Sequence, residues 1–198
     1  MESVAGSFAE RTRRRLRDEL LDAAYDAIVA GGYDGMRMGD IAVRTGVSRQ
    51  TVYNELGDKW SVLQAVANRE TERFLLEVND ALAAQADPID ALRAAVDRAL
   101  ALASDNPLLK AALTAPGSDQ ASQLLTTRGE QILQLSHERL DTHVREHWPQ
   151  VAPDDVATCV DIALRVVLSH IVSPAAPATD VADQVARVLG PFLREASA

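Results

Sequence analysis

The chain is poor in several residue types that define large classes of protein. It holds one cysteine, Cys159, so it can form neither an intramolecular disulfide framework nor a multi-cysteine zinc site. Aromatic residues make up only 4% of it, and no apolar run approaches the length of a transmembrane helix. Its beginning carries an arginine cluster and lacks the apolar block of a secretory signal. We therefore expect a soluble, cytoplasmic protein that does not associate with membranes.

The residues that are abundant are those from which helices are built. Hydrophobic residues make up 47% of the chain and charged residues 25%, a balance that excludes disorder. With few aromatics, 10 glycines and 8 prolines, the core must be filled by Leu, Val, Ile and Ala, which favours an all-α fold. Apolar residues at helical spacing predict about nine helices, over residues 11–30, 38–45, 49–56, 59–84, 88–103, 107–116, 118–147, 153–171 and 181–192.

Charge is distributed unevenly along the chain. The formal net charge is −9, but residues 1–70 hold 10 Lys or Arg and 11 Asp or Glu, a balance of −1. Residues 71–198 hold 10 Lys or Arg and 18 Asp or Glu, a balance of −8. The total argues against a generally basic nucleic-acid binder, and the asymmetry indicates two regions with different partners. We expect a three-helix N-terminal domain over residues 1–57 and a C-terminal helical bundle over residues 58–198.

The strongest local signal lies in residues 38–56. Ile41 and Ala42 form the inner face of one short helix, Val52 and Leu56 that of the next, and Gly46 permits a sharp turn between them. This is the pattern of a helix-turn-helix, whose second helix can enter the major groove of DNA, although an ordinary packed helical corner obeys the same packing rules. The exposed face favours DNA, because it carries hydrogen-bonding groups and no carboxylate: Arg49, Gln50, Thr51, Tyr53 and Asn54.

Several spaced motifs around this segment agree with one family. They are Gly32-Tyr33-Asp34, Asp40-Ile41-Ala42, Thr45-Gly46-Val47-Ser48, Thr51-Val52-Tyr53 and Lys59. With these motifs, residues 11–65 resemble the DNA-binding domain of the TetR family of bacterial transcriptional regulators. The remaining chain matches that family in length and helix count. The resemblance implies a ligand-responsive DNA-binding regulator, in the family's usual mode a repressor, and not an enzyme.

The resemblance also implies which residues meet a double-stranded DNA operator. Arg49, Gln50 and Thr51 would lie nearest the base edges, and Tyr53 and Lys59 would bind phosphates. Helix-turn-helix proteins commonly dimerise to read two half-sites one turn of DNA apart, so we expect a homodimer on a near-palindromic operator. The predicted DNA-binding set is Arg37, Thr45, Ser48, Arg49, Gln50, Thr51, Tyr53, Asn54 and Lys59.

The chain departs from the family pattern at two informative positions. Arg37 occupies a stretch where a capping hydroxyl is common, so it could instead reach a phosphate. Glu55 brings a carboxylate towards a polyanion, which weakens binding unless it points away or meets an arginine.

The arginine tract over residues 11–17 has two readings, an arm over the phosphates or a solvated helix start.

For the C-terminal region, the resemblance implies an inducer pocket inside the bundle and a dimer interface on the last two helices. The candidate lining is aliphatic and predicts a lipophilic small-molecule effector, for example a fatty-acyl-like compound; plain core packing is the alternative at each position. The predicted lining is Phe74, Val78, Leu92, Val96, Leu100, Leu125, Ile132, Leu135 and Val167. The predicted interface is Val160, Leu164, Val181, Val185, Leu189 and Phe192.

A helical enzyme or metal-binding bundle is the alternative function. His143 and His147 lie four residues apart on one helical face, as metal ligands often do. The chain has no HExxH motif, nucleophile-elbow motif or glycine-rich phosphate loop. We therefore expect no catalytic residue, no metal and no cofactor, and interpret Cys159 as a small buried hydrophobe.

Overall fold

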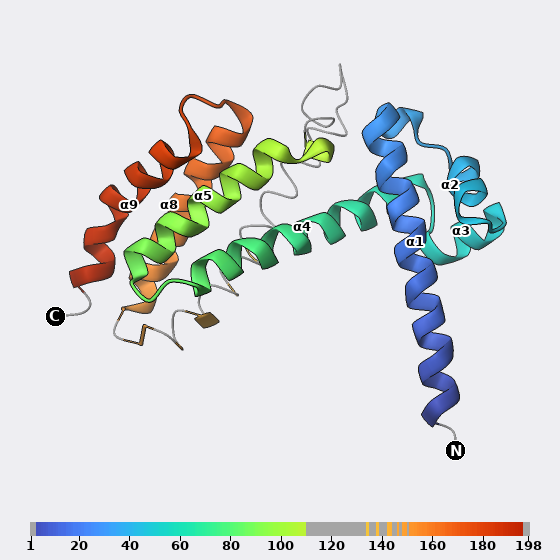
Figure 1. Cartoon of the computed structure of the whole chain (residues 1–198), viewed down its shortest axis with the longest axis horizontal. Coiled ribbons are helices and arrows are strands. Elements are labelled where there is room, and N and C mark those ends of the chain that lie inside the picture. Colours follow the sequence, from blue (N-terminus) through green and yellow to red (C-terminus); the bar gives the residue numbers. More distant parts are fainter. Residues whose placement is uncertain are drawn as a thin grey trace. The chain divides into compact units, whose positions relative to one another are not determined.

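The computed structural model describes residues 3–109 and 151–195, with residues 134, 138, 142, 143, 146, 148 and 149 between them. All regular secondary structure in these residues is helical, which confirms the predicted all-α class (Figure 1). The expected helices over 107–116 and 118–147 lie largely outside the described residues. No helix among those described is long and apolar enough to cross a bilayer. The chain divides into two compact units, Met1–Glu70 and Thr71–Ala198.

The first unit contains α1 (Ser3–Gly35), α2 (Met38–Thr45), α3 (Arg49–Leu56) and the start of α4 (Lys59–Ala83). α1 begins earlier than the predicted start at residue 11. The prediction missed residues 3–10 because they lack the apolar stripe by which periodicity detects a helix. Its helical conformation is interrupted at Gly32, where φ is 67°. The helix end predicted at residue 30 is therefore replaced by a kink at Gly32, because glycine has no Cβ to oppose a positive φ.

The core of the first unit is formed where α1, α2 and α3 pack on one another. α2 and α3 each bury the pair of positions that the helix-turn-helix pattern predicts. Met36, between α1 and α2, is 1% exposed and fills a position that helical spacing did not reveal. Deeply buried side chains of this core include Leu20, Ala24, Ile28, Met36, Ile41, Ala42, Val52, Leu56, Val62 and Val66.

The turn between α2 and α3 depends on Gly46. This residue adopts a left-handed conformation, with φ 70° and ψ 23°, and its N–H bonds to the last carbonyls of α2. The Val47 N–H then donates to the Ala42 carbonyl at 3.0 Å, which completes the C-terminal cap. These bonds reverse the chain within three residues and bring α3 against α2.

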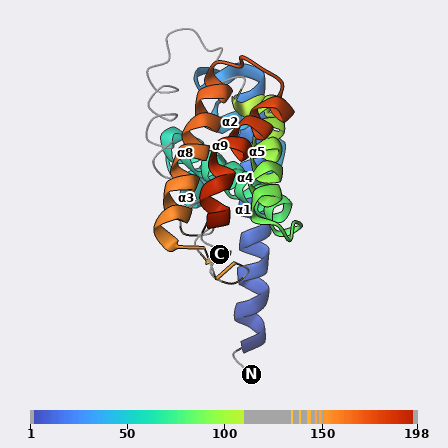
Figure 2. The ribbon, with the colours of Figure 1, turned by 90° about the vertical axis from the view of Figure 1, so that its left-hand side faces the viewer.

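The second unit contains the rest of α4 together with α5 (Pro88–Asp105), α8 (Pro153–Val172) and α9 (Ala178–Glu195). α5, α8 and α9 run side by side and pack on one another (Figure 2). α5 and α9 approach closely at Gly190, where an added Cβ would lie 3.1 Å from the Ile89 Cδ1 atom. A side chain at this position would therefore displace the Ile89 side chain by a few tenths of an ångström, and glycine avoids this contact.

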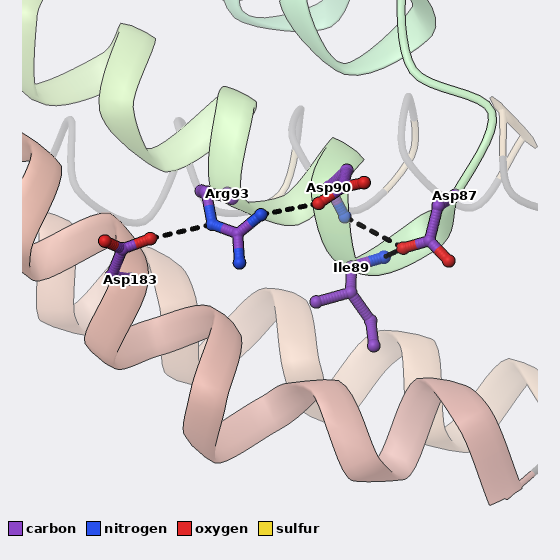
Figure 3. Close-up of polar contacts among 5 residues, drawn as sticks. All are labelled: Asp87, Ile89, Asp90, Arg93 and Asp183. Atoms are coloured by element: carbon purple, nitrogen blue, oxygen red, sulfur yellow. Dashed lines mark hydrogen bonds and ion pairs between the residues drawn. The ribbon is translucent and has the colours of Figure 1, made fainter.

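Polar contacts at the edge of the same crossing fix the start of α5 (Figure 3). The Asp87 carboxylate accepts hydrogen bonds from the backbone N–H groups of Ile89 and Asp90, at 2.8 and 3.0 Å, and so caps the helix. One turn later, Arg93 pairs with Asp90 and, at 2.8 Å, with Asp183 of α9. The pair with Asp183 orients α9 against α5. Because both ion pairs are exposed, they add little stability.

The backbone at Gly46 gives a test of the turn. Gly46→Ala places a Cβ in open space but forces an L-residue into the left-handed region, which costs about 1 kcal/mol of unfolding free energy. Gly31→Ala is the matched control, because it also meets nothing within 4 Å and has no positive φ. Denaturant unfolding should show a loss for Gly46→Ala only. Equal stability of the two variants would contradict a conformational requirement at the turn.

Candidate functional site

The start of α3 is held by two hydroxyl groups of the predicted DNA-binding set. The Ser48 Oγ atom caps the helix by accepting a hydrogen bond from the Thr51 N–H at 3.1 Å, and it lies 2.9 Å from the Thr51 Oγ1 atom. Ser48 has the extended backbone typical of an N-cap residue. α3 therefore starts at a well-defined residue, and the direction of the side chains that follow is set.

Four exposed side chains follow on α3, and we call them the exposed α3 row: Arg49, Gln50, Tyr53 and Asn54. The Gln50 amide donates to the Asn54 side-chain oxygen at 2.9 Å, one turn further along. The Tyr53 side chain is 42% exposed, although it is aromatic. The opposite side of α3 is buried through Val52, at 0% exposure, and Leu56. The row therefore presents hydrogen-bonding groups outwards from a helix whose other side is anchored in the core.

Two further members of the predicted set lie on α2. Arg37 occupies the N-cap position, makes no side-chain cap bond and is exposed, so its guanidinium is available to a ligand. The Thr45 hydroxyl donates within its own helix, to the Ile41 carbonyl at 2.8 Å. Thr45 therefore has a local structural role, and its oxygen can still accept a hydrogen bond.

Lys59 begins α4 and is tied to the end of α1. Its ammonium donates to the Asp34 carbonyl at 3.1 Å and lies 4.5 Å from the centre of the Tyr33 ring. The same ring meets Trp60 edge-on, with centroids 6.3 Å apart. Burial, followed by the carboxylates of Asp58 and Asp34, raises the pKa of Tyr33. The Gly-Tyr-Asp motif and the distant lysine are therefore parts of one packing unit, and the ammonium keeps donors for a phosphate.

Asp58 caps the start of α4. Its carboxylate accepts hydrogen bonds from the Ser61 N–H at 2.8 Å and from the Ser61 hydroxyl at 2.7 Å. These bonds from Ser61 favour the charged carboxylate and lower the pKa of Asp58. The cap fixes the helix start that carries Lys59.

Glu55 contacts two arginines of α1, one through its carboxylate and one through its backbone carbonyl. The Arg13 Nε atom lies 2.9 Å from the Glu55 Oε2 atom, and Arg17 donates to the Glu55 backbone carbonyl. The Glu55 side chain is only 17% exposed, whereas that of Arg13 is 71% exposed. The negative charge of Glu55 on α3 is therefore neutralised by Arg13 of α1. With this ion pair, a carboxylate at position 55 is compatible with binding to a polyanion.

The second unit encloses an apolar cavity of about 100 Å³ between α4, α5 and α8. The alanines at positions 91, 95 and 99 follow one face of α5 at intervals of four residues and leave room beside that helix. The indole N–H of Trp148 donates to the Ala86 carbonyl at 2.9 Å, so the polar group of this lining residue is satisfied. Cys159 also lines the cavity, and burial raises the pKa of its thiol. Among the described residues that line this space, none is charged.

The predicted pocket residues have several locations. Val78, Leu92, Val96 and Val167 line the cavity. Leu100 is buried in the core and Phe74 packs against it, but neither lines the cavity. The predicted lining residues Leu125, Ile132 and Leu135 lie outside the described residues.

The predicted interface residues are mostly inside the second unit. Val160 and Leu164 line the cavity. Val181, Val185 and Leu189 are at most 5% exposed, because the apolar stripe of α9 packs on α5 and α8. Phe192, at 53% exposure, is the member of the predicted set that a second subunit can readily reach. The exposed large hydrophobic residues of α8 and α9 are Ile162, Val172, Val188 and Phe192.

The alternative metal site does not gain support from this geometry. His143 is buried and its ring lies edge-on to Trp148, with centroids 5.4 Å apart, while His147 falls outside the described residues. In the part of the chain that the structure describes, no three His, Cys, Asp or Glu side chains form a group suited to a metal ion.

Comparison with known families identifies both units. Residues 20–66 match the family described as bacterial regulatory proteins, tetR family. Residues 87–191, more than half of the chain, match the description bacterial tetracyclin repressor, C-terminal domain. The chain belongs to the TetR family.

TetR-family relatives match most of the chain. The transcriptional regulator AlkX of Mycobacterium tuberculosis is 29% identical over 186 residues, which are 93% of this chain and 88% of AlkX. The repressor KstR of Mycolicibacterium smegmatis is 33% identical over 113 residues, 57% of this chain and 54% of KstR. The crystal structure of the TetR family repressor AlkX from a Dietzia species, implicated in biodegradation of n-alkanes, superposes with a TM-score of 0.72 at 25% identity, covering 90% and 97% of the two chains.

As a TetR-family member, the protein is a DNA-binding transcriptional regulator and not an enzyme. Sequence reasoning overlooked the cavity residues Trp148 and Cys159 and the alanine face of α5. The four-residue spacing of those alanines was a usable signal, because small residues on one helical face leave space beside the helix. No signal in the sequence indicated that Trp148 pairs with a carbonyl 62 residues away.

The lowered pKa of Asp58 predicts a pH-dependent contribution to stability. Its folded-state pKa lies below the ordinary value of 3.8, so the contribution is fully present above that value and is lost as pH falls through the folded pKa. Asp58→Ala should therefore lower the thermal unfolding midpoint at neutral pH, and the difference from wild type should shrink in acid. Ser61→Ala, which keeps the backbone bond to the carboxylate, is the control and should lose less. A difference that is constant with pH would contradict this account.

Proposed function

We propose that the protein is a repressor that leaves a near-palindromic operator when a lipophilic small molecule binds inside its second unit. The observation that carries this proposal is the pairing of two features in one chain. α3 exposes a hydrogen-bonding row in the first unit, and the second unit contains a cavity whose described lining residues are all uncharged.

The DNA side of the proposal rests on the chemistry of α3 and its surroundings. Arg49, Gln50 and Asn54 carry groups that can pair with guanine and adenine edges in the major groove. Tyr53, Thr45, Ser48 and Thr51 have hydroxyls suited to phosphate contacts, and Arg37 and Lys59 supply positive charge. Because Arg13 neutralises the Glu55 carboxylate, this surface repels the phosphates of DNA less than an unpaired carboxylate would.

The effector side rests on the cavity. The described lining consists of apolar side chains, one indole and one thiol, which favours an apolar or aliphatic part of a ligand beside it. The similar AlkX from Dietzia is implicated in biodegradation of n-alkanes, which agrees with an aliphatic effector. We propose a fatty-acyl-like or other lipophilic compound with its chain in this cavity.

The connection between the two sites is α4. Lys59 to Glu70 belong to the first unit and Thr71 to Ala83 to the second, within one helix. α4 supplies Lys59 to the first unit and Val78 and Leu82 to the cavity wall. A ligand that binds one arrangement of this wall more tightly shifts the population of states through α4, and only that difference in affinity can release DNA.

We further propose a homodimer as the DNA-binding form. The exposed apolar side chains of α8 and α9 support a subunit interface, because large apolar groups on a surface are favourably covered by another chain. Two copies of α3 then read two half-sites of the operator.

The DNA contacts can be tested by gel shift with the DNA flanking the protein's own coding region. Arg49→Ala and Tyr53→Ala should each weaken specific retardation by about tenfold or more, since a base or charged contact of this kind contributes roughly 1–3 kcal/mol. Both side chains are exposed, so neither change should alter the unfolding midpoint.

Val43→Ala is the matched control, because Val43 is 83% exposed on α2 and lies outside the proposed set. It should bind as wild type does. Unchanged retardation by both Arg49→Ala and Tyr53→Ala would refute the assignment of α3 as the recognition helix.

The effector site can be tested by filling the cavity. Ala163→Leu adds three carbons to a wall residue of the cavity, so it should occupy the volume that the ligand needs. The variant should keep operator binding, lose release by palmitate, and lose lipophilic compounds from solvent extracts of the purified protein analysed by mass spectrometry. Overpacking should cost about 1–3 kcal/mol of stability, which denaturant unfolding measures.

Ala157→Leu is the control, because it makes the same change on the exposed side of the same helix. It should retain both release and bound compound. If Ala163→Leu carried the same bound compound in the same amount as wild type, the ligand would have to occupy another site.

A further inference from the structure

The N-terminal part of α1 is not needed to build the core of the first unit. From residue 8 onwards, the first buried side chain of α1 is Leu20, and residues 8–15 are all exposed. Figure 1 shows this part of α1 extending beyond α2 and α3. It also precedes residue 20, at which the match to the family begins. Folding of the helix-turn-helix therefore does not account for five arginines between residues 11 and 17.

This arginine segment, residues 11–17, is nevertheless fixed to α3. Arg13 pairs with the Glu55 carboxylate at 2.9 Å, and Arg17, one turn later on the same face of α1, donates to the Glu55 carbonyl. Glu55 follows Tyr53 and Asn54 of the exposed α3 row directly in α3. Two contacts to one residue therefore hold the arginine segment beside the proposed recognition helix.

Stability is a weak explanation for these contacts. The Arg13 side chain is 71% exposed, and an exposed ion pair contributes about 0–1 kcal/mol. A guanidinium has five N–H donors, and the contact with Glu55 engages the one on Nε. Arg13 can therefore neutralise the carboxylate with one edge and offer its remaining donors to another anion.

Arg14 extends the same positive surface. It is exposed, follows Arg13 by about 100° around the helix, and forms no ion pair among the described residues. Arg15 differs, because its Nε atom pairs with Glu19 at 3.1 Å and it lies about 200° from Arg13, on the opposite side of α1. The segment therefore has one side joined to α3 and another side whose charge is balanced locally.

We propose that the arginine segment is a second DNA-binding element, in which Arg13 and Arg14 bind phosphates flanking the groove that α3 enters. Glu55 is its positioning residue: its carboxylate holds Arg13, and its carbonyl holds Arg17, so that the segment follows the recognition helix onto the duplex. The inference rests on the proposed role of α3. Its support is the complementarity of an exposed guanidinium pair to phosphate and its continuity with the helix-turn-helix.

The salt dependence of DNA binding tests this element in the full-length protein. Fluorescence anisotropy with a labelled mixed-sequence duplex, over a series of KCl concentrations, gives the slope of log K against log salt. Arg14→Ala should reduce the magnitude of that slope by about one per bound subunit, since each lost phosphate contact releases one counterion fewer. Arg15→Ala removes the same charge from the other side of α1 and should leave the slope unchanged.

Glu55 is tested with Arg13 in a double-mutant cycle. Arg13→Ala should lower affinity more than Arg14→Ala, because it removes a phosphate contact and also uncovers the carboxylate. Adding Glu55→Gln to Arg13→Ala should recover part of that loss without restoring the slope. Thermal unfolding midpoints should stay close to that of wild type throughout, which separates this role from a structural one.

Slopes equal to that of wild type for both Arg13→Ala and Arg14→Ala would overturn the inference. That result together with loss of operator retardation in Arg49→Ala would leave the proposed recognition helix intact. The converse, reduced slopes with operator retardation unchanged in Arg49→Ala and Tyr53→Ala, would retain the arginine element and reject α3.

Discussion

The left-handed backbone of Gly46 is the constraint on which the DNA-binding surface depends. It allows α2 to end and α3 to begin within three residues, with Ser48 placed to cap α3. Val52 and Leu56 are then directed into the core, and the helical period directs the exposed α3 row outwards. A residue with a Cβ at this turn would strain the conformation that sets this direction, although nothing crowds the position itself.

The motifs shared with TetR regulators acquire a physical meaning through the packing around this turn. Tyr33 and the Asp34 carbonyl hold Lys59, so the end of α1 fixes the start of α4. Asp58 caps that same helix start. Residues that are separated in the sequence therefore act as one support for the helix-turn-helix, and their functional contribution includes this support as well as any contact with DNA.

The second unit balances close packing against retained space. α9 packs closely on α5 at Gly190, where an added side chain would contact Ile89. The apolar stripe of α9 is buried in its contacts with α5 and α8. On the other side of α5, alanines leave a cavity next to α4 and α8. Protein interiors are normally filled to high density, so a space of this kind costs stability and is consistent with a ligand site.

The sequence alone determined the helical class, the helix-turn-helix and which residues of α3 are exposed. These properties follow from local rules: apolar periodicity, the conformational freedom of glycine and the capping preference of serine. The pairing of Glu55 with Arg13 was decided only by the tertiary structure, because the two residues are 42 positions apart in the sequence. The division of apolar stripes between core, cavity and surface was decided in the same way. Periodicity tells which face of a helix is buried, but the neighbour that buries Val181 or Val185 depends on how helices distant in the chain come together.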